Sequence, residues 1–482
     1  MNGRADTADL SSGMSDARQR ESPLEKLIRQ FHDFNDELLF ECEGGQNVLK
    51  NIQAQLNGTY SLGKPIKVTI LANDCNGISS FFHAELAKQL AKFTQTGVEV
   101  SLLVPESELI SDWDKRRLEA NGVTIVKAKK RPCFPDPIDW LYYPPEKLKS
   151  GIVIGIGARL GNIAQHWKER YQCKSIYIDQ GNEWPFSGYY EVVETYQDLE
   201  DIRKGFSIAA NIPVAIGAKT TDDLSASLRS EGKQVFNLTP GIISEFSNLN
   251  HATNDGRNYR VLLLGGDNPD NFFKDGFKTA ADAVAELKNN SYHLIYVGAG
   301  KGTEQQFKDL FHMCGVSKSQ LRIRNLPKTE DEWKKLFCEV DLAIMPSGDK
   351  EFGLEALLAL SAGLPVLVHG ESGFGEALRD VTFGTSAIVD SDDAREWASR
   401  IKTIRETDRK TRLEQAAMLR SNYNEKYSWE KQLTPLVAMM FMMVSATIFT
   451  LTQNLIQEIK GDLKKESPQA SSLLLTGDIN TQ

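Results

Sequence analysis

Residues 343–368 read AIMPSGDKEFGLEALLALSAGLPVLV, and this stretch decides the fold. The apolar run at 342–345 predicts a buried strand, and a glycine-containing turn follows it. Leucines at helical spacing predict a helix over 354–361, which Gly363 ends before a second strand at 366–368. A strand, a glycine turn and a helix N-terminus together predict an anion site, because free N–H groups and the helix dipole point at the turn.

Outward from this stretch, short apolar runs alternate with helical patterns. Runs typical of strands stand at 66–72, 98–104, 123–126, 152–156, 175–178, 214–216, 235–238, 260–264, 293–297, 321–323 and 387–389. Strands that alternate with helices of this length predict an α/β fold with doubly wound parallel sheets.

The composition narrows the class of protein. A chain of 482 residues with a net charge of −9 does not suit a general binder of nucleic acid, so no nucleic-acid partner is expected. Its six cysteines form no C-x-x-C pair, which argues against zinc and against a disulfide framework. Residues 1–22 are polar, so we expect disorder and no secretory signal there.

The central stretch resembles the donor-site segment of GT-B glycosyltransferases of the retaining, family-4 type. Their usual form is Pro-Ser, a few residues, Glu-Gly-Phe-Gly-Leu, a helix with a second Glu, and Gly-x-Pro-Val. Residues 240–246 resemble the segment that joins the two halves of such enzymes, and 427–430 resemble a later Ser-Trp-Glu motif. The stretches 336–347 and 372–378 resemble the branch of family 4 found in animal conflict or immune-type proteins.

The resemblance covers roughly residues 62–440 and implies two Rossmann-like domains that face each other across a cleft. The expected parts are a disordered start (1–22), a helical extension (23–60), an N-terminal acceptor-side domain (61–247), a C-terminal nucleotide-sugar domain (259–432), an apolar helix (433–460) and a disordered tail (461–482). The polar residues 248–258 then form the linker.

The resemblance also implies a nucleotide-sugar donor, an acceptor of unknown identity, and no metal or other cofactor. The family holds the donor with an Arg, a Lys, a helix N-terminus and two carboxylates. The residues that remain for these roles are a catalytic Glu351 and the donor-binding Gly77, Gly265, Lys274, Gly353, Leu354, Glu355 and Glu376.

Several polar positions of the family pattern are altered. Leu358 replaces the second carboxylate, and a leucine cannot bind the ribose hydroxyls. Lys350 stands at the first carboxylate position, although Glu351 would substitute if the turn shifts, and Glu355 offers another rescue. Gly266 stands where the family has Arg.

Other positions leave alternatives open. Lys274 is either the family's donor lysine or a plain surface lysine. The family's histidine position holds Ile156, and His83 is either a fallback polar group for the site or a histidine on a helix surface. One glycine, Gly77, survives from the family's Gly-Gly loop.

Two hypotheses about function follow. The first is a glycosyltransferase that moves a sugar from a nucleotide-sugar to an acceptor. The second is a catalytically degenerate GT-B scaffold that acts as a binding or signalling module. The scaffold favours the first hypothesis and the replaced residues favour the second, so the sequence leaves the question of enzyme activity open.

An uncharged stretch at 433–452 also allows two interpretations. It has nearly the length of a membrane span, but five Ser and Thr residues dilute it. It is either the buried closing helix of a GT-B fold or a membrane-associated tail. We expect a cytoplasmic protein, with membrane association through 433–452 as the alternative.

Overall fold

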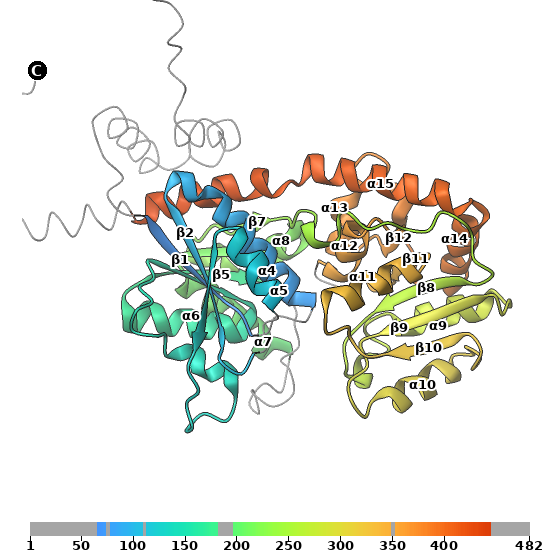
Figure 1. Cartoon of the computed structure of the whole chain (residues 1–482), viewed down its shortest axis with the longest axis horizontal. Helices are drawn as coiled ribbons and strands as arrows, with labels where there is room; N and C mark the ends of the chain where they lie inside the picture. The colour runs from blue at the N-terminus through green and yellow to red at the C-terminus, as the bar shows by residue number, and fades with distance from the viewer. Residues whose placement is uncertain (1–64, 74–77, 109–111, 182–195, 349–351, 445–482) are drawn as a thin grey trace, which may run out of the picture. The chain divides into compact units, whose positions relative to one another are not determined.

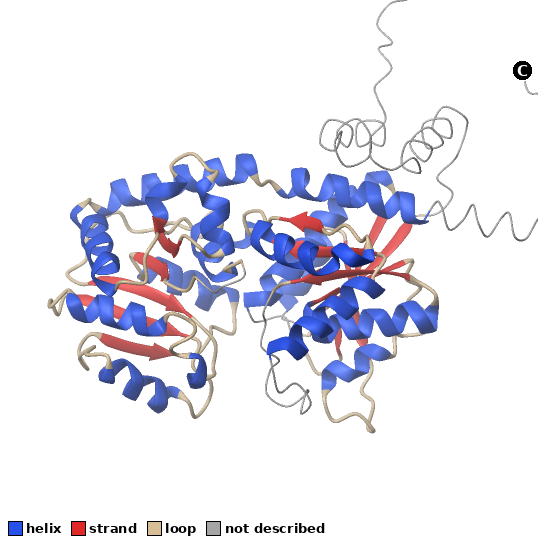
Figure 2. Cartoon of the chain, turned by 180° about the vertical axis from the view of Figure 1, so that it is seen from behind, coloured by secondary structure: helices blue, strands red, loops and turns tan. Residues whose placement is uncertain are grey.

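The computed structural model describes residues 65–73, 78–108, 112–181, 196–348 and 352–444. All of them belong to one compact unit, residues 64–482. Two parallel sheets with helices packed on both faces form this unit, which confirms the predicted α/β fold (Figures 1 and 2). The predicted helical extension and both predicted disordered ends lie outside the described residues.

The first sheet has seven parallel strands in the order β3-β2-β1-β4-β5-β6-β7. The strands are β1 (Ile66–Leu71), β2 (Val98–Pro105), β3 (Val123–Ala128), β4 (Ile152–Ile156), β5 (Lys174–Asp179), β6 (Ile212–Ile216) and β7 (Phe236–Leu238). The helices of this half are α4 (Ile78–Ala91), α5 (Asp112–Ala120), α6 (Gly157–Tyr171), α7 (Tyr196–Ala209) and α8 (Gly217–Leu228), with short 3₁₀ turns η1 (Lys92–Thr96), η2 (Pro137–Tyr142) and η3 (Arg229–Glu231). His83 on α4 is buried, so the prediction of a surface histidine is wrong: this face of α4 packs inside the protein.

The second sheet has six parallel strands in the order β10-β9-β8-β11-β12-β13. The strands are β8 (Tyr259–Leu264), β9 (Tyr292–Val297), β10 (Leu321–Arg324), β11 (Leu342–Met345), β12 (Val366–His369) and β13 (Ile388–Val389). The helices are α9 (Phe277–Glu286), α10 (Glu304–Met313), α11 (Glu330–Glu339), α12 (Leu354–Ser361), α13 (Gly373–Arg379), α14 (Ala394–Glu406) and α15 (Arg409–Lys426), with 3₁₀ turns η4 (Ser244–Phe246), η5 (Pro269–Asn271) and η6 (Gly384–Ala387).

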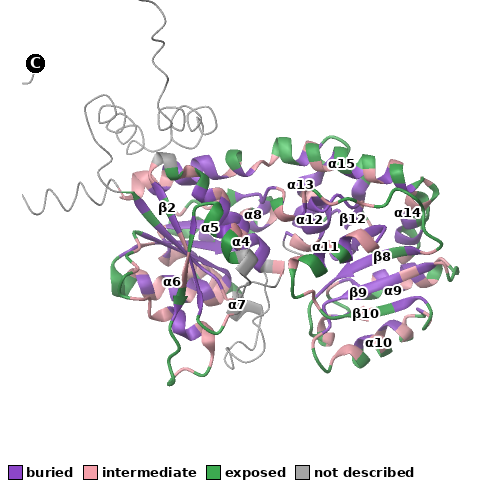
Figure 3. Cartoon of the chain, viewed as in Figure 1, coloured by how far each residue is buried: buried purple, intermediate pink, exposed green. Residues whose placement is uncertain are grey.

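Burial explains why these segments become strands. Every residue of β4, β6, β11 and β12 is buried, because helices cover both faces of a parallel sheet (Figure 3). Side-chain caps set several helix starts. Thr329 caps α11 and Asp408 caps α15, each by accepting a backbone N–H from the first turn.

The last helices run from the second sheet back toward the first (Figure 1). The Tyr423 hydroxyl on α15 donates to the carbonyl of Pro240 (2.7 Å), and the Trp429 indole donates to the carbonyl of Ile242 (3.0 Å). The helix 429–444 that follows buries apolar side chains, among them Leu433 and Leu436.

In the described part of the chain no helix is both long and apolar enough to cross a membrane. Residues 445–452 lie outside the described ranges. The alternative of a membrane-associated tail therefore stays a prediction.

A buried ion network joins α4, η4 and α11. The Lys88 ammonium donates to both carboxylate oxygens of Glu245 (2.8 Å) and lies 2.6 Å from a carboxylate oxygen of Glu85. Arg117 on α5 lies 2.7 Å from Glu245 and 3.2 Å from Glu330 at the start of α11. The network therefore ties the first sheet's helices to the linker and to the second sheet's helices.

A second buried ion pair anchors α15. Arg409 at the start of α15 pairs with Asp341, which directly precedes β11, and both side chains are 6% exposed. Asp341 also accepts the backbone N–H of Arg260 (2.8 Å), and Arg409 donates to the carbonyl of Ala252 (2.7 Å). The Arg409–Asp341 pair thus connects α15 with strand β11, strand β8 and the linker.

Candidate functional site

The candidate site lies at the carboxyl ends of β8, β11 and β12. In the sheet, strand β8 has β9 on one side and β11 on the other. The strand order reverses at this point, and open parallel sheets bind ligands at such a reversal. The loops after β8 and β11, together with α12 and α13, carry all the described residues that the sequence predicts for the donor.

The loops after β8 and β11 touch each other. Gly276, the N-cap of α9, has φ +74°, and a Cβ there would lie 2.8 Å from the backbone N of Ser347. The Ser347 hydroxyl donates to the carbonyl of Lys274 (3.4 Å). Lys274 is exposed, so its backbone lies beside the central stretch and its side chain is accessible from solvent.

Helix α12 begins at a glycine that packing requires. Gly353 has φ +89°, and a Cβ there would lie 2.4 Å from Cε of Met345. Among the described residues no side chain caps the start of α12. Leu354 and Glu355 in its first turn are half-buried. Backbone N–H groups and the positive end of the helix dipole therefore face this end of the sheet.

The two glycines after β8 have different environments. A Cβ on Gly265 would lie 2.3 Å from Cζ of Phe277 and 2.9 Å from the ring of Tyr296, so Gly265 serves close packing of α9 against β9. A Cβ on Gly266 would meet nothing within 4 Å. The position at which the family has Arg is therefore open to solvent.

Leu358 is 1% exposed in the middle of α12. Six of the eight residues of this helix are buried, whereas the leucine spacing predicts a single apolar face. Helix α4 of the first half packs on α12, which explains the wider burial. The position that the family uses for a ribose-binding carboxylate is part of the core here.

The sequence reasoning missed Lys219, which comes from the first half of the chain. Its ammonium donates to the carbonyl of Gly348 (2.8 Å) and to the carbonyl of Glu371 (2.7 Å), in the loops after β11 and β12. Gly217 at the start of α8 packs on Phe352, because a Cβ there would lie 2.7 Å from its ring. The signal was available: Lys219 stands three residues after the carboxyl end of a buried strand.

Glu376 on α13 lies in the same region and is half-buried. Burial raises the pKa of its carboxyl, while the Lys219 charge acts to lower this pKa and Asp222 acts to raise it. Glu376 therefore takes up a proton more readily than an exposed glutamate.

His369 at the end of β12 is a second residue that the sequence reasoning missed. It is 4% exposed, and its Nδ1 accepts the backbone N–H of Glu371 (3.2 Å). Its Nε2 lies 3.4 Å from a carboxylate oxygen of Asp392. The imidazole thus forms part of the wall between the loops after β11 and β12.

The structure brings Gly265, Lys274, Gly353, Leu354 and Glu355 to the carboxyl ends of the neighbouring strands β8 and β11, and it places Glu376 on the helix after β12. Gly77 and Glu351 lie outside the described residues, so their roles stay predictions. Within the described ranges no group of three or more His, Cys, Asp and Glu side chains is placed to hold a metal ion. The expectation of a metal-independent reaction also stays a prediction.

The chain matches a known protein family over most of its length. The sequence pattern of the family described as "Family 4 Glycosyltransferase in conflict systems" matches residues 74–436. Two curated relatives are D-inositol 3-phosphate glycosyltransferases. The relative from Rhodococcus opacus is 26% identical over 155 residues, which cover 32% of this chain and 34% of the relative. The relative from Salinispora arenicola is 30% identical over 142 residues, which cover 29% of this chain and 30% of the relative. The chain spans about a third of the length of the curated relatives it matches.

Two solved structures have a similar fold. Anabaena HepE in complex with UDP and glucose has a TM-score of 0.52 and 14% identity, over 80% of this chain and 99% of that one. The catalytic domain of starch synthase IV from Arabidopsis thaliana, bound to ADP and acarbose, has a TM-score of 0.56 and 12% identity, over 79% and 100%. At these identities the likeness concerns the fold alone, which is the predicted GT-B fold.

Proposed function

Because this chain belongs to the family 4 glycosyltransferases of conflict systems, we propose that it transfers a sugar from a nucleotide-sugar donor to an acceptor. The observation that carries the proposal is the contact between Gly276 and Ser347. It brings the start of α9 against the loop after β11, at the point where the strand order of the second sheet reverses. A nucleoside diphosphate carries its charge on two phosphates, and the backbone N–H groups at the starts of α9 and α12 suit such a ligand.

Each remaining polar group takes a role in this proposal. The start of α12 at Gly353 and Leu354 holds the diphosphate through backbone N–H groups, and Lys274 supplies a positive charge. Glu376 contacts the sugar, and Glu351 keeps its predicted catalytic role. The leaving nucleoside diphosphate gains negative charge as the glycosidic bond breaks, and these donors stabilise that charge.

The donor nucleotide is tested first with UDP and ADP, since two proteins of similar fold hold these nucleotides. Titration calorimetry on the full chain is expected to show saturable binding of one of them. Lys274→Gln is expected to weaken this binding, because it removes a charge beside the diphosphate.

A substitution at Gly266 gives the sharpest test of the site. The position is open, so Gly266→Arg restores the cation of the family pattern without a steric clash. We expect Gly266→Arg to tighten nucleotide binding by about tenfold, which is about 1.4 kcal/mol, through bonds from the guanidinium to phosphate. Gly266→Ala is the matched control and is expected to leave the affinity unchanged. A folded protein that binds none of UDP, ADP and GDP, with or without Gly266→Arg, would overturn sugar transfer.

A second candidate function is a degenerate scaffold that binds a ligand or partner without transfer. The burial of Leu358 favours it, since that position no longer offers a carboxylate to a ribose. Release of free nucleotide from UDP-sugars or ADP-sugars separates the two candidates. Transfer predicts release that Lys274→Gln slows, and the scaffold predicts no release even when a nucleotide binds.

A further inference from the structure

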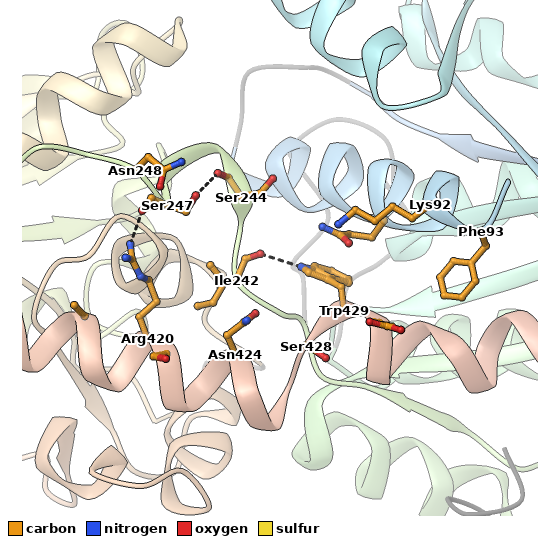
Figure 4. Close-up of a pocket in the computed structure, with 14 residues that line it drawn as sticks. Lys92, Phe93, Ile242, Ser244, Ser247, Asn248, Arg420, Asn424, Ser428 and Trp429 are labelled. Carbon is orange, nitrogen blue, oxygen red and sulfur yellow. Dashed lines mark hydrogen bonds between the residues drawn. The ribbon is translucent and has the colours of Figure 1, made fainter. Parts of the chain in front are cut away.

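A cavity of about 730 Å³ lies away from the candidate donor site (Figure 4). Three parts of the chain form its walls: the end of α4 with η1, the linker around η4, and the helices from α15 onward. The Trp429 indole donates to the carbonyl of Ile242 (3.0 Å), and this bond fixes the helix 429–444 against the linker. The walls are therefore held in place by bonds of the protein itself.

The charge of this pocket is positive, although the chain is acidic as a whole. Arg420 and Lys92 line it from opposite sides, and Glu430 is the one carboxylate among the described lining residues (Figure 4). Arg420 is half-buried, and its Nη1 donates to the carbonyls of Ser247 and Ser361 (3.0 Å each). These two bonds use two of its five N–H donors.

Arg420 has no carboxylate partner among the described residues. Its pKa is lowered by burial, and no neighbouring charge opposes that effect. A guanidinium that has lost part of its hydration and gained no counter-charge is suited to an anion, and its planar donors match phosphate oxygens. The second cation, Lys92, is exposed and stands across the pocket from Arg420.

The rest of the lining is rich in hydroxyl and amide side chains. Asn248 from the linker and Asn424 from α15 are examples that point toward the cavity (Figure 4). Side-chain amides both donate and accept hydrogen bonds, as sugar hydroxyls do. A ligand with one phosphate and several hydroxyls therefore matches both the cations and the neutral groups of the walls.

We propose that this pocket binds a small phosphorylated sugar, at a site separate from the donor site. The separation follows from α12. Arg420 bonds to Ser361 at the last residue of this helix, whereas the candidate donor site lies at its first residues. Eight helical residues span about 12 Å, so one ligand does not reach both ends with the same phosphate.

The test is titration calorimetry on the full chain with glucose 6-phosphate, inorganic phosphate and glucose. We expect saturable binding of glucose 6-phosphate that weakens as salt is raised, and weaker binding of the other two. Arg420→Gln is expected to weaken it by about tenfold through loss of a bond to phosphate, and Lys92→Gln is expected to weaken it through loss of a positive charge that attracts the phosphate. Because Lys92 is exposed, Lys92→Gln remains a fair test even if Arg420→Gln unfolds the protein.

Two controls separate this site from the rest of the chain. Lys410→Gln lies on the same helix as Arg420 and pairs only with the exposed Glu414, so it is expected to leave the affinity unchanged. Lys274→Gln belongs to the donor site, and it too is expected to have no effect on glucose 6-phosphate. Failure of nucleotide binding thus leaves the test of this pocket intact.

Three results would overturn the proposal. The first is the absence of binding by glucose 6-phosphate to the folded wild-type chain. The second is binding that Lys92→Gln leaves unchanged. The third is equal affinity for inorganic phosphate and glucose 6-phosphate, which would remove the sugar from the assignment.

Discussion

Leu358 shows at the scale of one residue how the donor site departs from its family. The side chain is 1% exposed, so Leu358→Glu would bury a carboxylate and remove apolar packing. We expect this change to lower the free energy of unfolding by about 3 kcal/mol or more, measured by urea denaturation. Leu358→Met keeps the volume and is expected to cost less than about 1.5 kcal/mol. A stable Leu358→Glu variant that binds UDP more tightly would contradict this and show a polar cavity beside α12.

Single residues differ in how far the sequence predicts them. The need for glycine at 353 was visible, because the residue stands between a strand and a helix start, and the structure gives it a φ of +89°. The packing role of Gly265 was not visible, because it depends on Phe277 and Tyr296 from other elements. For Lys219 the position after a buried strand was visible, but its contacts were not, because its two carbonyl partners are 129 and 152 residues away along the chain.

At the scale of elements, the ion pair of Arg409 and Asp341 fixes α15 on the second sheet. Both side chains are 6% exposed. We expect Asp341→Ala to lower the free energy of unfolding by about 3–5 kcal/mol, because it leaves the Arg409 charge buried without a partner. Glu414→Ala removes the exposed pair with Lys410 and serves as the control, with an expected loss below about 1 kcal/mol. Similar losses for both variants, in urea denaturation, would show that burial of the first pair carries no weight.

The strands were predictable because those of a covered parallel sheet are continuous apolar runs. The strands of the structure begin and end within a few residues of the predicted ones. Helix α13 was not predicted, since it is seven residues long and contains two glycines. Helix α12 was predicted with one apolar face but is buried more widely, because α4 belongs to a distant part of the sequence.

At the scale of the whole molecule, Lys88, Glu245 and Arg117 form a network that reaches Glu330 of the second half through Arg117. Burial raises the pKa of Glu85. Burial also acts to raise the pKa of Glu245, but Lys88 and Arg117 hold it below its usual value. The lowered pKa of Glu245 contributes stability at neutral pH that is lost as the pH falls through its folded-state pKa.

Lys88→Met removes the shared cation and leaves two buried carboxylates together. We expect a loss of about 3–5 kcal/mol at about pH 7. The pKa of Glu85, already raised by burial, then rises further, while Arg117 still pairs with Glu245, so the variant loses stability as the pH rises and regains it as the pH falls. The gap to the wild type is expected to narrow toward about pH 5, in urea denaturation at several pH values. A gap that stays constant would mean that Lys88 acts through packing alone.

The contacts between the halves were beyond the sequence analysis. Two Rossmann-like halves followed from the pattern of runs and from the family resemblance, but no local pattern reports which helix of one half meets which loop of the other. The pairing of Lys88 with Glu245 spans 157 residues, and the pairing of Arg117 with Glu330 spans 213.

The glycines at 265, 276 and 353 have a consequence for how such a protein evolves. Each is required by a close approach of atoms within the folded chain, whether or not a donor is bound. Selection for folding alone would therefore retain the glycine frame of the motif, while the polar positions drift with the chemistry. In lineages of this kind the conserved glycines would therefore indicate common ancestry, whereas the side chains at positions such as 266 and 358 would indicate the present activity of the site.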